Sequence, residues 1–210
     1  IGPYGGTFGV YKGLYEEFGE DRVRDGPLCE PATCGFGIGL ALAGMPAIVE
    51  IEFDDFLTLA SDALVNQAAK MRSFLGGQVQ VPLVVRTPVV NRLGLGAQHS
   101  QSLEAWFMHV PGLRVVMPSS PADAKGLMIQ SIRDPNPVLF IENVRLYSVK
   151  GEVPDAAEPI PFGQVRTVRA GSDVTIVTYS AMVGPCLKAA ENAAADGIDC
   201  EVLDLRTLSP

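Results

Sequence analysis

The segment RDGPLCEPATCGFGIGLALAG (residues 24–44) decides the fold, because it joins a short expected strand to an apolar helix rich in small residues. We expect the strand over residues 22–25 and the helix over residues 31–44, with proline at its first position. The helix begins with the spacing G-x-G-x-G, whereas a dinucleotide-binding turn needs G-x-G-x-x-G. A dinucleotide-binding protein is therefore disfavoured. The small residues are expected to let the helix pack closely on a sheet or on another subunit.

Glu30 stands beside the N-terminus of this expected helix, where a phosphate would otherwise meet the helix. The helix dipole stabilises an exposed carboxylate at that place by roughly 0.3 to 1 kcal/mol. Burial in an apolar pocket would act the other way and raise its pKa. A carboxyl group held between these influences can share a proton with a ring nitrogen. The commoner alternative is a helix-terminal carboxylate without chemistry.

Strand and helix patterns alternate along the following hundred residues. Apolar segments of strand type alternate with helical periodicity, and Ser120 and Pro121 mark the start of the last of these helices. Such alternation builds βαβ units, in which helices cover both faces of a parallel sheet. The sequence therefore predicts a three-layer α/β fold with a mostly parallel sheet, with strands over residues 47–53, 81–88, 113–119 and 137–143 and helices over residues 56–75 and 120–134.

The character of the chain changes after the last of these strands. Residues 150–164 (KGEVPDAAEPIPFGQ) are rich in proline and acids and show no core period, so we expect residues 145–172 to form a surface linker. A strand, a helix and a strand follow between residues 173 and 205. We therefore expect a first domain over residues 1–144 and the start of a second α/β domain over residues 173–210, which would make the chain a fragment of a longer protein.

Composition excludes several classes of partner. The formal charge of -8 and the pI near 4.7 disfavour nucleic acid and anionic membrane surfaces as partners. No apolar run is long enough to span a bilayer, so no membrane is expected. The four cysteines have no metal-ligand spacing, and we interpret them as reduced core residues of a cytoplasmic (bacterial) or organellar matrix protein.

The two histidines stand in different surroundings. His99 lies in the polar cluster AQHSQ, in a glycine-containing loop after the strand at residues 81–88. Loops at the carboxyl ends of parallel strands are where α/β proteins bind ligands, so His99 is a candidate functional residue. His109 follows a cluster of large apolar residues and is expected to be a packed or interface residue. Two distant histidines do not make a zinc site.

Two further short motifs allow a functional and a purely structural interpretation. In FDDF (residues 53–56), Phe56 could wall a flat ring, or Asp54 or Asp55 could cap a helix start. In RDPNP, Asp134 and Asn136 could bind a hard cation together with helix-end carbonyls. From these residues alone, capping of the turn is favoured.

Taken together and in order, these segments resemble the beta subunit of the thiamine-diphosphate-dependent 2-oxoacid dehydrogenases, which act on pyruvate, branched-chain 2-oxo acids or acetoin. The resemblance covers nearly the whole chain. It rests on the segments GGTFGVYKGL, FGEDRVRDGPLCEPATCGFGIGLALAG, VEIEFDDF, NQAAKMR, GGQVQVPLVVRTP, LGAQHSQSLEAWFMHVPGLRVVMPSSPADAKGL, IRDPNPVLFIEN and DVTIVTYSAMV.

The resemblance implies a role for each candidate residue. Glu30 would hydrogen-bond the aminopyrimidine ring of thiamine diphosphate and promote removal of the thiazolium C2 proton. Phe56 would lie against that ring, and His99 would assist acyl transfer to a lipoyl arm. Residues from 173 onward would start the transketolase-like C-terminal domain. The resemblance also implies a structural potassium ion held by the side chains of Asp134 and Asn136 and by the backbone carbonyls of Leu83, Ser131 and Ile132.

The sequence lacks the motif that binds the diphosphate in thiamine enzymes, which begins GDG and ends in asparagine. We therefore expect a separate alpha subunit to hold the diphosphate and Mg2+, with the cofactor at the interface of an α2β2 heterotetramer. The other expected partners are the lipoyl acyltransferase core of a multienzyme complex and a small 2-oxo acid substrate. Pyruvate is the first expectation. The alternatives are an acetoin dehydrogenase beta subunit and a non-catalytic assembly module of the same fold.

Overall fold

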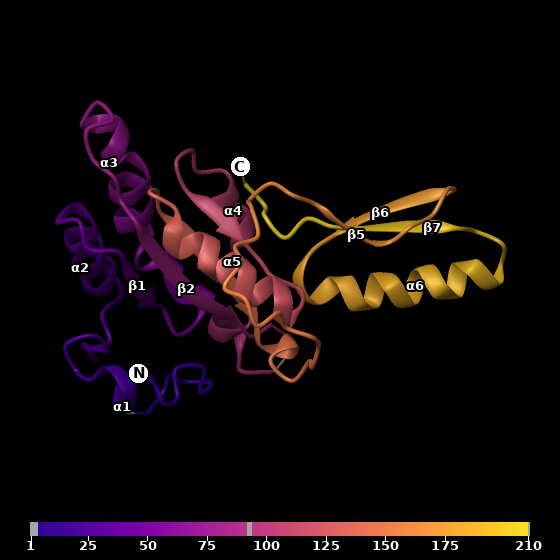
Figure 1. The fold of residues 1–210 in the computed structure, drawn as a ribbon, viewed down its shortest axis with the longest axis horizontal. Helices are drawn as coiled ribbons and strands as arrows, with labels where there is room; N and C mark the ends of the chain where they lie inside the picture. Colours follow the sequence, from indigo (N-terminus) through magenta and orange to yellow (C-terminus); the bar gives the residue numbers. More distant parts are fainter. Residues whose placement is uncertain (1–3, 92–93, 210) are drawn as a thin grey trace.

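A four-stranded parallel sheet, sheet A, forms the centre of the first part of the chain (Figure 1). The structure is a computed structural model that describes residues 4–91 and 94–209, so residues 92–93 of the loop before His99 lie outside it. The predicted α/β fold with a parallel sheet is confirmed. The strands of sheet A, in spatial order, are β1 (Ala47–Glu50), β2 (Leu83–Val89), β4 (Val138–Asn143) and β3 (Arg114–Val116).

Helices cover both faces of sheet A, as predicted. On one face α2 (Glu30–Leu42) packs on β1 and β2, and α5 (Pro121–Arg133) lies on the opposite face. Ser120 caps α5, since its side chain accepts a hydrogen bond from the Asp123 N–H. Strand β2 is buried along its whole length, which explains its nearly continuous apolar sequence.

The helix expected over residues 56–75 is present but irregular. It consists of a 3-10 turn η1 (Asp54–Thr58), a π-helical segment η2 (Ala63–Ala68) and the helix α3 (Ala69–Phe74). Its buried apolar side chains join those of α2 in the larger core cluster. π-Helical segments widen a helix locally and are frequent near functional sites.

The expected strand at residues 22–25 is absent. These residues are irregular, and the helix before them is the short α1 (Leu14–Phe18). Arg22 and Arg24 are exposed, and Arg24 pairs with Asp21 on the surface. The prediction was wrong because a strand needs one face to bury, and this charged segment offers none.

A second, three-stranded sheet, sheet B, follows in the order β5 (Arg166–Arg169), β7 (Cys200–Asp204) and β6 (Val174–Thr178). Helix α6 (Val183–Ala195) covers one face of sheet B, to the right in Figure 1. Strand β6 is parallel to β7, whereas β5 is antiparallel to it.

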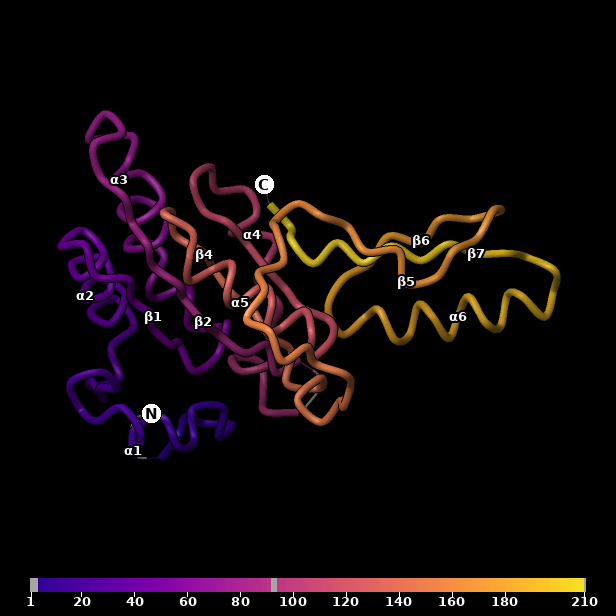
Figure 2. The backbone as a smooth tube through the Cα atoms, viewed as in Figure 1, coloured from indigo at the N-terminus to yellow at the C-terminus, as the bar shows by residue number. Residues whose placement is uncertain are grey.

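The segment expected to be a surface linker is more structured than predicted. It contains β5, and its path runs along α5 before that strand (Figure 2). Ile160 and Phe162 pack against the smaller core cluster on the α5 face, and Ile160 lies directly over Gly126 of α5. The segment contains few apolar residues, and its sequence did not reveal that these two side chains become half-buried by tertiary contact.

The chain after β7 returns to the first sheet and joins the two parts. Residues 206–209 run beside β3, with an antiparallel bridge between Val116 and Thr207. The Arg206 side chain donates to a buried carboxylate oxygen of Asp123 at 3.1 Å. The remaining short elements are η3 (Ala97–His99), α4 (Glu104–Met108), η4 (Val144–Leu146) and η5 (Ser180–Met182).

Two expectations from composition can be compared with the structure. No helix within the described ranges is long and apolar enough to cross a membrane. The cysteines are free thiols: Cys34 and Cys200 are buried and Cys186 is half-buried, but Cys29 is exposed. The core assignment was therefore wrong for Cys29, which precedes α2 at the surface.

Candidate active site

The three candidate catalytic and cofactor-binding residues lie at the edge of sheet A where its parallel strands end. Phe56 lies in η1, which follows β1, and His99 lies in η3, which follows β2. Glu30 is the first residue of α2. Because the short connection at residues 43–46 makes α2 run antiparallel to β1, the N-terminus of α2 lies at the same edge. Ligands of α/β sheets bind at this edge.

The structure brings His99 and Phe56 into contact. The rings of His99 and Phe56 meet edge to face, with centroids 5.1 Å apart and planes at 87°. Phe53 completes the group, with its ring 4.8 Å from His99 and 5.9 Å from Phe56. Phe8 of the N-terminal segment packs on Phe53 at 6.1 Å. We call Phe8, Phe53, Phe56 and His99 the aromatic cluster.

Glu30 offers a carboxylate that has no partner among the described residues. It is half-buried, and the residue before it, Cys29, gives no side-chain cap to α2. Within residues 4–91 and 94–209 the Glu30 carboxylate makes no hydrogen bond or ion pair. It is therefore free to bind an external donor next to the positive end of the helix dipole.

The second histidine does not join the site. His109 is exposed at the end of α4, and the neighbouring Trp106 is 64% exposed. The expectation of a packed residue is therefore not met within the chain. The exposed position of His109 is compatible with the other expectation, that it is an interface residue.

Asp54 and Asp55 do not cap a helix start as the sequence suggested. No side chain caps η1. Instead, Asp54 Oδ2 accepts from the Leu103 N–H at 3.0 Å, and Asp55 Oδ1 accepts from the N–H and side-chain amide of Gln101 at 3.2 and 2.7 Å. The capping interpretation was wrong because these partners lie almost fifty residues away, where no local pattern can reveal them.

A buried arginine fixes the strands beneath this edge. Arg86 of β2 is 2% exposed and donates to Glu50 of β1 at 2.9 Å, to Glu142 of β4, and to the Tyr147 hydroxyl at 2.6 Å. The Tyr11 ring lies under its guanidinium group. Burial raises the pKa of Glu50, and Arg86 opposes this shift. Arg86 was not identified from the sequence, although a single arginine within the apolar run LVVRTPV could have indicated a buried charge.

The residues expected to hold potassium lie at the opposite edge of the sheet, where the strands begin. Asp134 Oδ1 accepts from the backbone N–H and the side-chain amide of Asn136, both at 2.9 Å, while Oδ2 pairs with Arg114 at 3.2 Å. Asn136 Oδ1 accepts from Arg72 at 3.0 Å. The turn-capping interpretation of RDPNP is thus confirmed. These side-chain oxygens already have donors, so an ion here would depend on backbone carbonyls such as that of Leu83.

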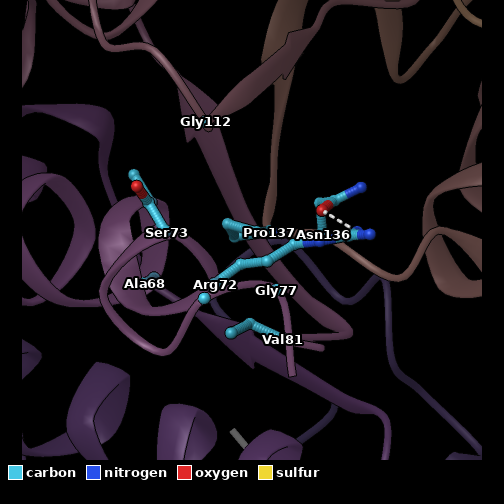
Figure 3. Close-up of a pocket in the computed structure, with 10 residues that line it drawn as sticks. Ala68, Arg72, Ser73, Gly77, Val81, Gly112, Asn136 and Pro137 are labelled. Atoms are coloured by element: carbon cyan, nitrogen blue, oxygen red, sulfur yellow. Dashed lines mark hydrogen bonds between the residues drawn. The ribbon is translucent and has the colours of Figure 1, made fainter. Parts of the chain in front are cut away.

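A hollow of about 430 Å3 lies at this same edge, between α3 and the starts of the strands (Figure 3). Arg72 and Ser73 of α3 line one side, and Gly112, Asn136 and Pro137 line the other. Figure 3 shows the hydrogen bond between Arg72 and Asn136 that runs beside it. The hollow contains none of the residues of the aromatic cluster, so it is not the candidate site.

Comparisons with known proteins agree with this arrangement. Residues 3–150 match the family model of the transketolase pyrimidine binding domain, and residues 163–210 match that of the transketolase C-terminal domain. The chain has the fold of a chain of a split gene transketolase described as an inactive beta4 tetramer, with a TM-score of 0.78 and 20% identity over 93% of this chain and 61% of that one.

Two curated relatives are beta subunits of oxidoreductases. The chain is 51% identical, over 99% of its length, to the beta subunit of acetoin:2,6-dichlorophenolindophenol oxidoreductase from Cupriavidus necator. It is 48% identical, over its whole length, to the beta subunit of the pyruvate dehydrogenase E1 component from Rickettsia felis. The chain spans 61% and 64% of the length of these relatives. The resemblance to the beta subunits of 2-oxoacid dehydrogenases is confirmed, and the chain belongs to the transketolase pyrimidine-binding domain family.

Proposed function

We propose that the chain acts as the beta subunit of a thiamine-diphosphate-dependent 2-oxoacid dehydrogenase, in oxidative decarboxylation of pyruvate or a related 2-oxo acid and acyl transfer to a lipoyl domain. The observation that carries this proposal is the unpartnered carboxylate of Glu30. It starts a helix at the same sheet edge as the contact between Phe56 and His99. Residues 1–144 would bind the pyrimidine, and residues 173–210 would start the partner-binding domain. Residues 145–172 would connect these two domains.

The proposed cofactor fits these residues. Thiamine diphosphate, when bound, supplies the electron sink for decarboxylation. Glu30 would hold a proton between its carboxylate and a nitrogen of the aminopyrimidine ring, a hydrogen bond that its position at the helix N-terminus favours. Phe56 would offer an apolar wall to the ring. His99, whose ring packs against that of Phe56, would give a proton to the lipoyl sulfur that is released when the acyl group is transferred.

We propose that an alpha subunit supplies the diphosphate and Mg2+ site in an α2β2 assembly, because this sequence carries no GDG motif. The outer face of α2 is the proposed contact surface. Phe36 is 58% exposed and Leu42 39% exposed on that face, beside the exposed Gly35 and Gly39. A helix that is apolar on all sides is normally covered by protein. The lipoyl acyltransferase core would be the further partner, in a bacterial cytoplasm or an organelle matrix.

We propose a potassium ion only as a structural element at the start of β2. Backbone carbonyls of Leu83, Ser131 and Ile132 would have to supply most of its ligands, because donors already occupy Asp134 and Asn136. Thermal unfolding in potassium and in lithium salts of equal concentration tests it. A melting temperature that is the same in both salts would contradict the ion.

Reconstitution tests the proposed function. The protein is combined with an alpha subunit that carries the GDG motif, and turnover of pyruvate and of acetoin is measured with an artificial electron acceptor. We expect tight cofactor binding and turnover only in the combined sample, with the faster substrate identifying the reaction. Equally tight thiamine diphosphate binding by this chain alone would contradict the shared site. A cofactor-bound complex without turnover of any 2-oxo acid would favour the non-catalytic assembly module.

A further inference from the structure

Asp54 and Asp55 connect the element that carries Phe56 to the segment that carries His99. Both carboxyl groups are buried, with 0% and 3% of these residues exposed. They accept three hydrogen bonds from Gln101 and Leu103, which lie two and four residues after His99. Among the residues that the structure describes, these three are the hydrogen bonds that tie residues 97–103 to an element distant in the sequence. Of the loop before His99, the described residues 94–96 are exposed.

Each of the two carboxyl groups has one oxygen atom without a hydrogen-bond donor. Asp54 Oδ1 and Asp55 Oδ2 are buried without a hydrogen-bond partner, and within the described part of the chain neither aspartate makes a salt bridge. A third carboxylate acts on Asp54 from another element: Glu104 at the start of α4, which accepts from the Ser102 and Tyr179 hydroxyls at 2.8 and 3.0 Å. Buried charges without counter-charges are costly, and neighbouring carboxyl groups relieve the cost by retaining a proton.

We propose that Asp54 and Asp55 share one proton and, as a neutral-plus-anionic pair, position His99 against Phe56. The shared proton gives the two unpartnered oxygens a hydrogen bond to each other, while the outer oxygens keep their bonds to Gln101 and Leu103. The pair is a positioning device, because neither carboxyl group touches the reacting atoms. Its link to acyl transfer rests on the proposed function, whereas its effect on the place of His99 does not.

The surroundings of the pair determine the pH range over which it holds the shared proton. Burial, together with the carboxylates of Asp55 and Glu104, raises the pKa of Asp54 to about 7. The other titratable groups nearby are His99 itself and Tyr179, whose hydroxyl binds Glu104. The pair therefore keeps its proton below pH 7 and loses it above. Loss of the proton places two negative charges in one buried site and loosens the segment after His99.

Histidine NMR on the full chain, assembled with its alpha subunit, tests the position of His99 without using activity. The 210 residues contain two histidines, and 13C labelling of histidine in this chain gives a ring signal for each of them. A His109→Gln variant assigns them. In the wild type, the rings of Phe53 and Phe56 shift the His99 signal away from that of an exposed histidine.

The variants separate the shared proton from simple packing. We expect Asp54→Asn, which can donate to Asp55 and accept from Leu103, to keep the His99 shift and to hold it above pH 7, where the wild type loses part of it. Asp54→Ala and Asp55→Ala should lose the shift at every pH. Ser61→Ala is the matched control, since its hydroxyl bonds only to carbonyls within its own segment.

Activity gives a second measurement that keeps the two proposals apart. Asp54→Ala should slow acyl transfer to a lipoyl domain roughly 10- to 100-fold, the loss expected when a group is misplaced by about 1 Å, with decarboxylation little changed. An unmoved His99 signal in both alanine variants would overturn the positioning role of the pair. An Asp54→Asn variant that behaves like Asp54→Ala would overturn the shared proton. A wild-type complex without decarboxylation would overturn the proposed function, while the NMR result would still decide the role of the pair.

Discussion

Replacing Gly37 with alanine should destabilise the chain, whereas replacing Gly39 with alanine on the same helix should stabilise it. A methyl group at Gly37 would lie 2.7 Å from Val49 Cγ1 and 2.9 Å from Leu83 Cδ1, both in the core between α2 and the sheet. A methyl group at Gly39 would meet nothing within 4 Å. The two positions are alike in sequence, so the comparison isolates packing from helix propensity.

The magnitude follows from two opposed contributions. Alanine is favoured over glycine in a helix interior by about 0.8 to 1 kcal/mol, which applies at both positions. Overpacking of a filled core costs about 1 to 3 kcal/mol and applies only at Gly37. We therefore expect the free energies of unfolding of the two variants to differ by about 1 to 3 kcal/mol, or roughly 2 to 12 °C in melting temperature for a chain of this size.

Urea unfolding followed by circular dichroism measures this difference. Equal stability of the Gly37→Ala and Gly39→Ala variants would refute the close packing of α2 on β1 and β2. In the assembled protein the expectation for Gly39 reverses, because this residue lies on the proposed alpha-subunit surface. There the added methyl group should weaken subunit association although it stabilises the isolated helix.

Three further predictions concern stability. Gly112→Ala should lower the free energy of unfolding by more than about 2 kcal/mol, because its Cβ would overlap the Ala69 carbonyl at a residue with positive φ. Gly163 also has a positive φ but lies in open space, so Gly163→Ala should lower this free energy less in the same urea titration. Asp54 binds a proton in the folded chain but not in the unfolded chain between pH 4 and pH 7, so the free energy of unfolding should fall by up to roughly 4 kcal/mol as the pH rises over that range. Asp54→Asn should flatten this dependence of stability on pH. A variant with the same pH dependence as the wild type would contradict the retained proton. Arg86→Met should cost about 3 to 5 kcal/mol by leaving two buried glutamates without their counter-charge, and a thermal melt like that of the wild type would contradict this.

The sheet and its helices were predictable because their signals are local. Apolar runs mark the buried strands β2 and β4, and Ser120 and Pro121 mark the start of α5. Residues 22–25 misled the prediction because a short alternating segment of this kind says nothing about whether a neighbouring strand is available. Strand β5 was not predicted, because it forms by pairing with β7 and its own sequence does not indicate a strand.

The candidate site likewise contains residues that local patterns identified and contacts that they did not. Glu30, Phe56 and His99 were found from their places beside a helix start and after strands, and the structure places Phe56 and His99 in contact. The partners of Asp54 and Asp55 were out of reach, because they depend on how two loops meet across the edge of the sheet. Local patterns thus identify where ligands can bind, and tertiary contacts identify what holds the binding residues in place.

In the proposed reaction, the carboxylate of Glu30 would activate a cofactor that this chain holds by the pyrimidine ring alone. The most direct measurement is the rate of 2-oxo acid decarboxylation by the complete alpha–beta assembly carrying Glu30→Gln, beside a Glu17→Gln control on the exposed face of α1. We expect an assembly of wild-type stoichiometry whose decarboxylation falls by roughly 100-fold or more, a loss typical for removal of a proton-transfer group. The control should keep the wild-type rate. A Glu30→Gln assembly that decarboxylates at the wild-type rate would contradict the account.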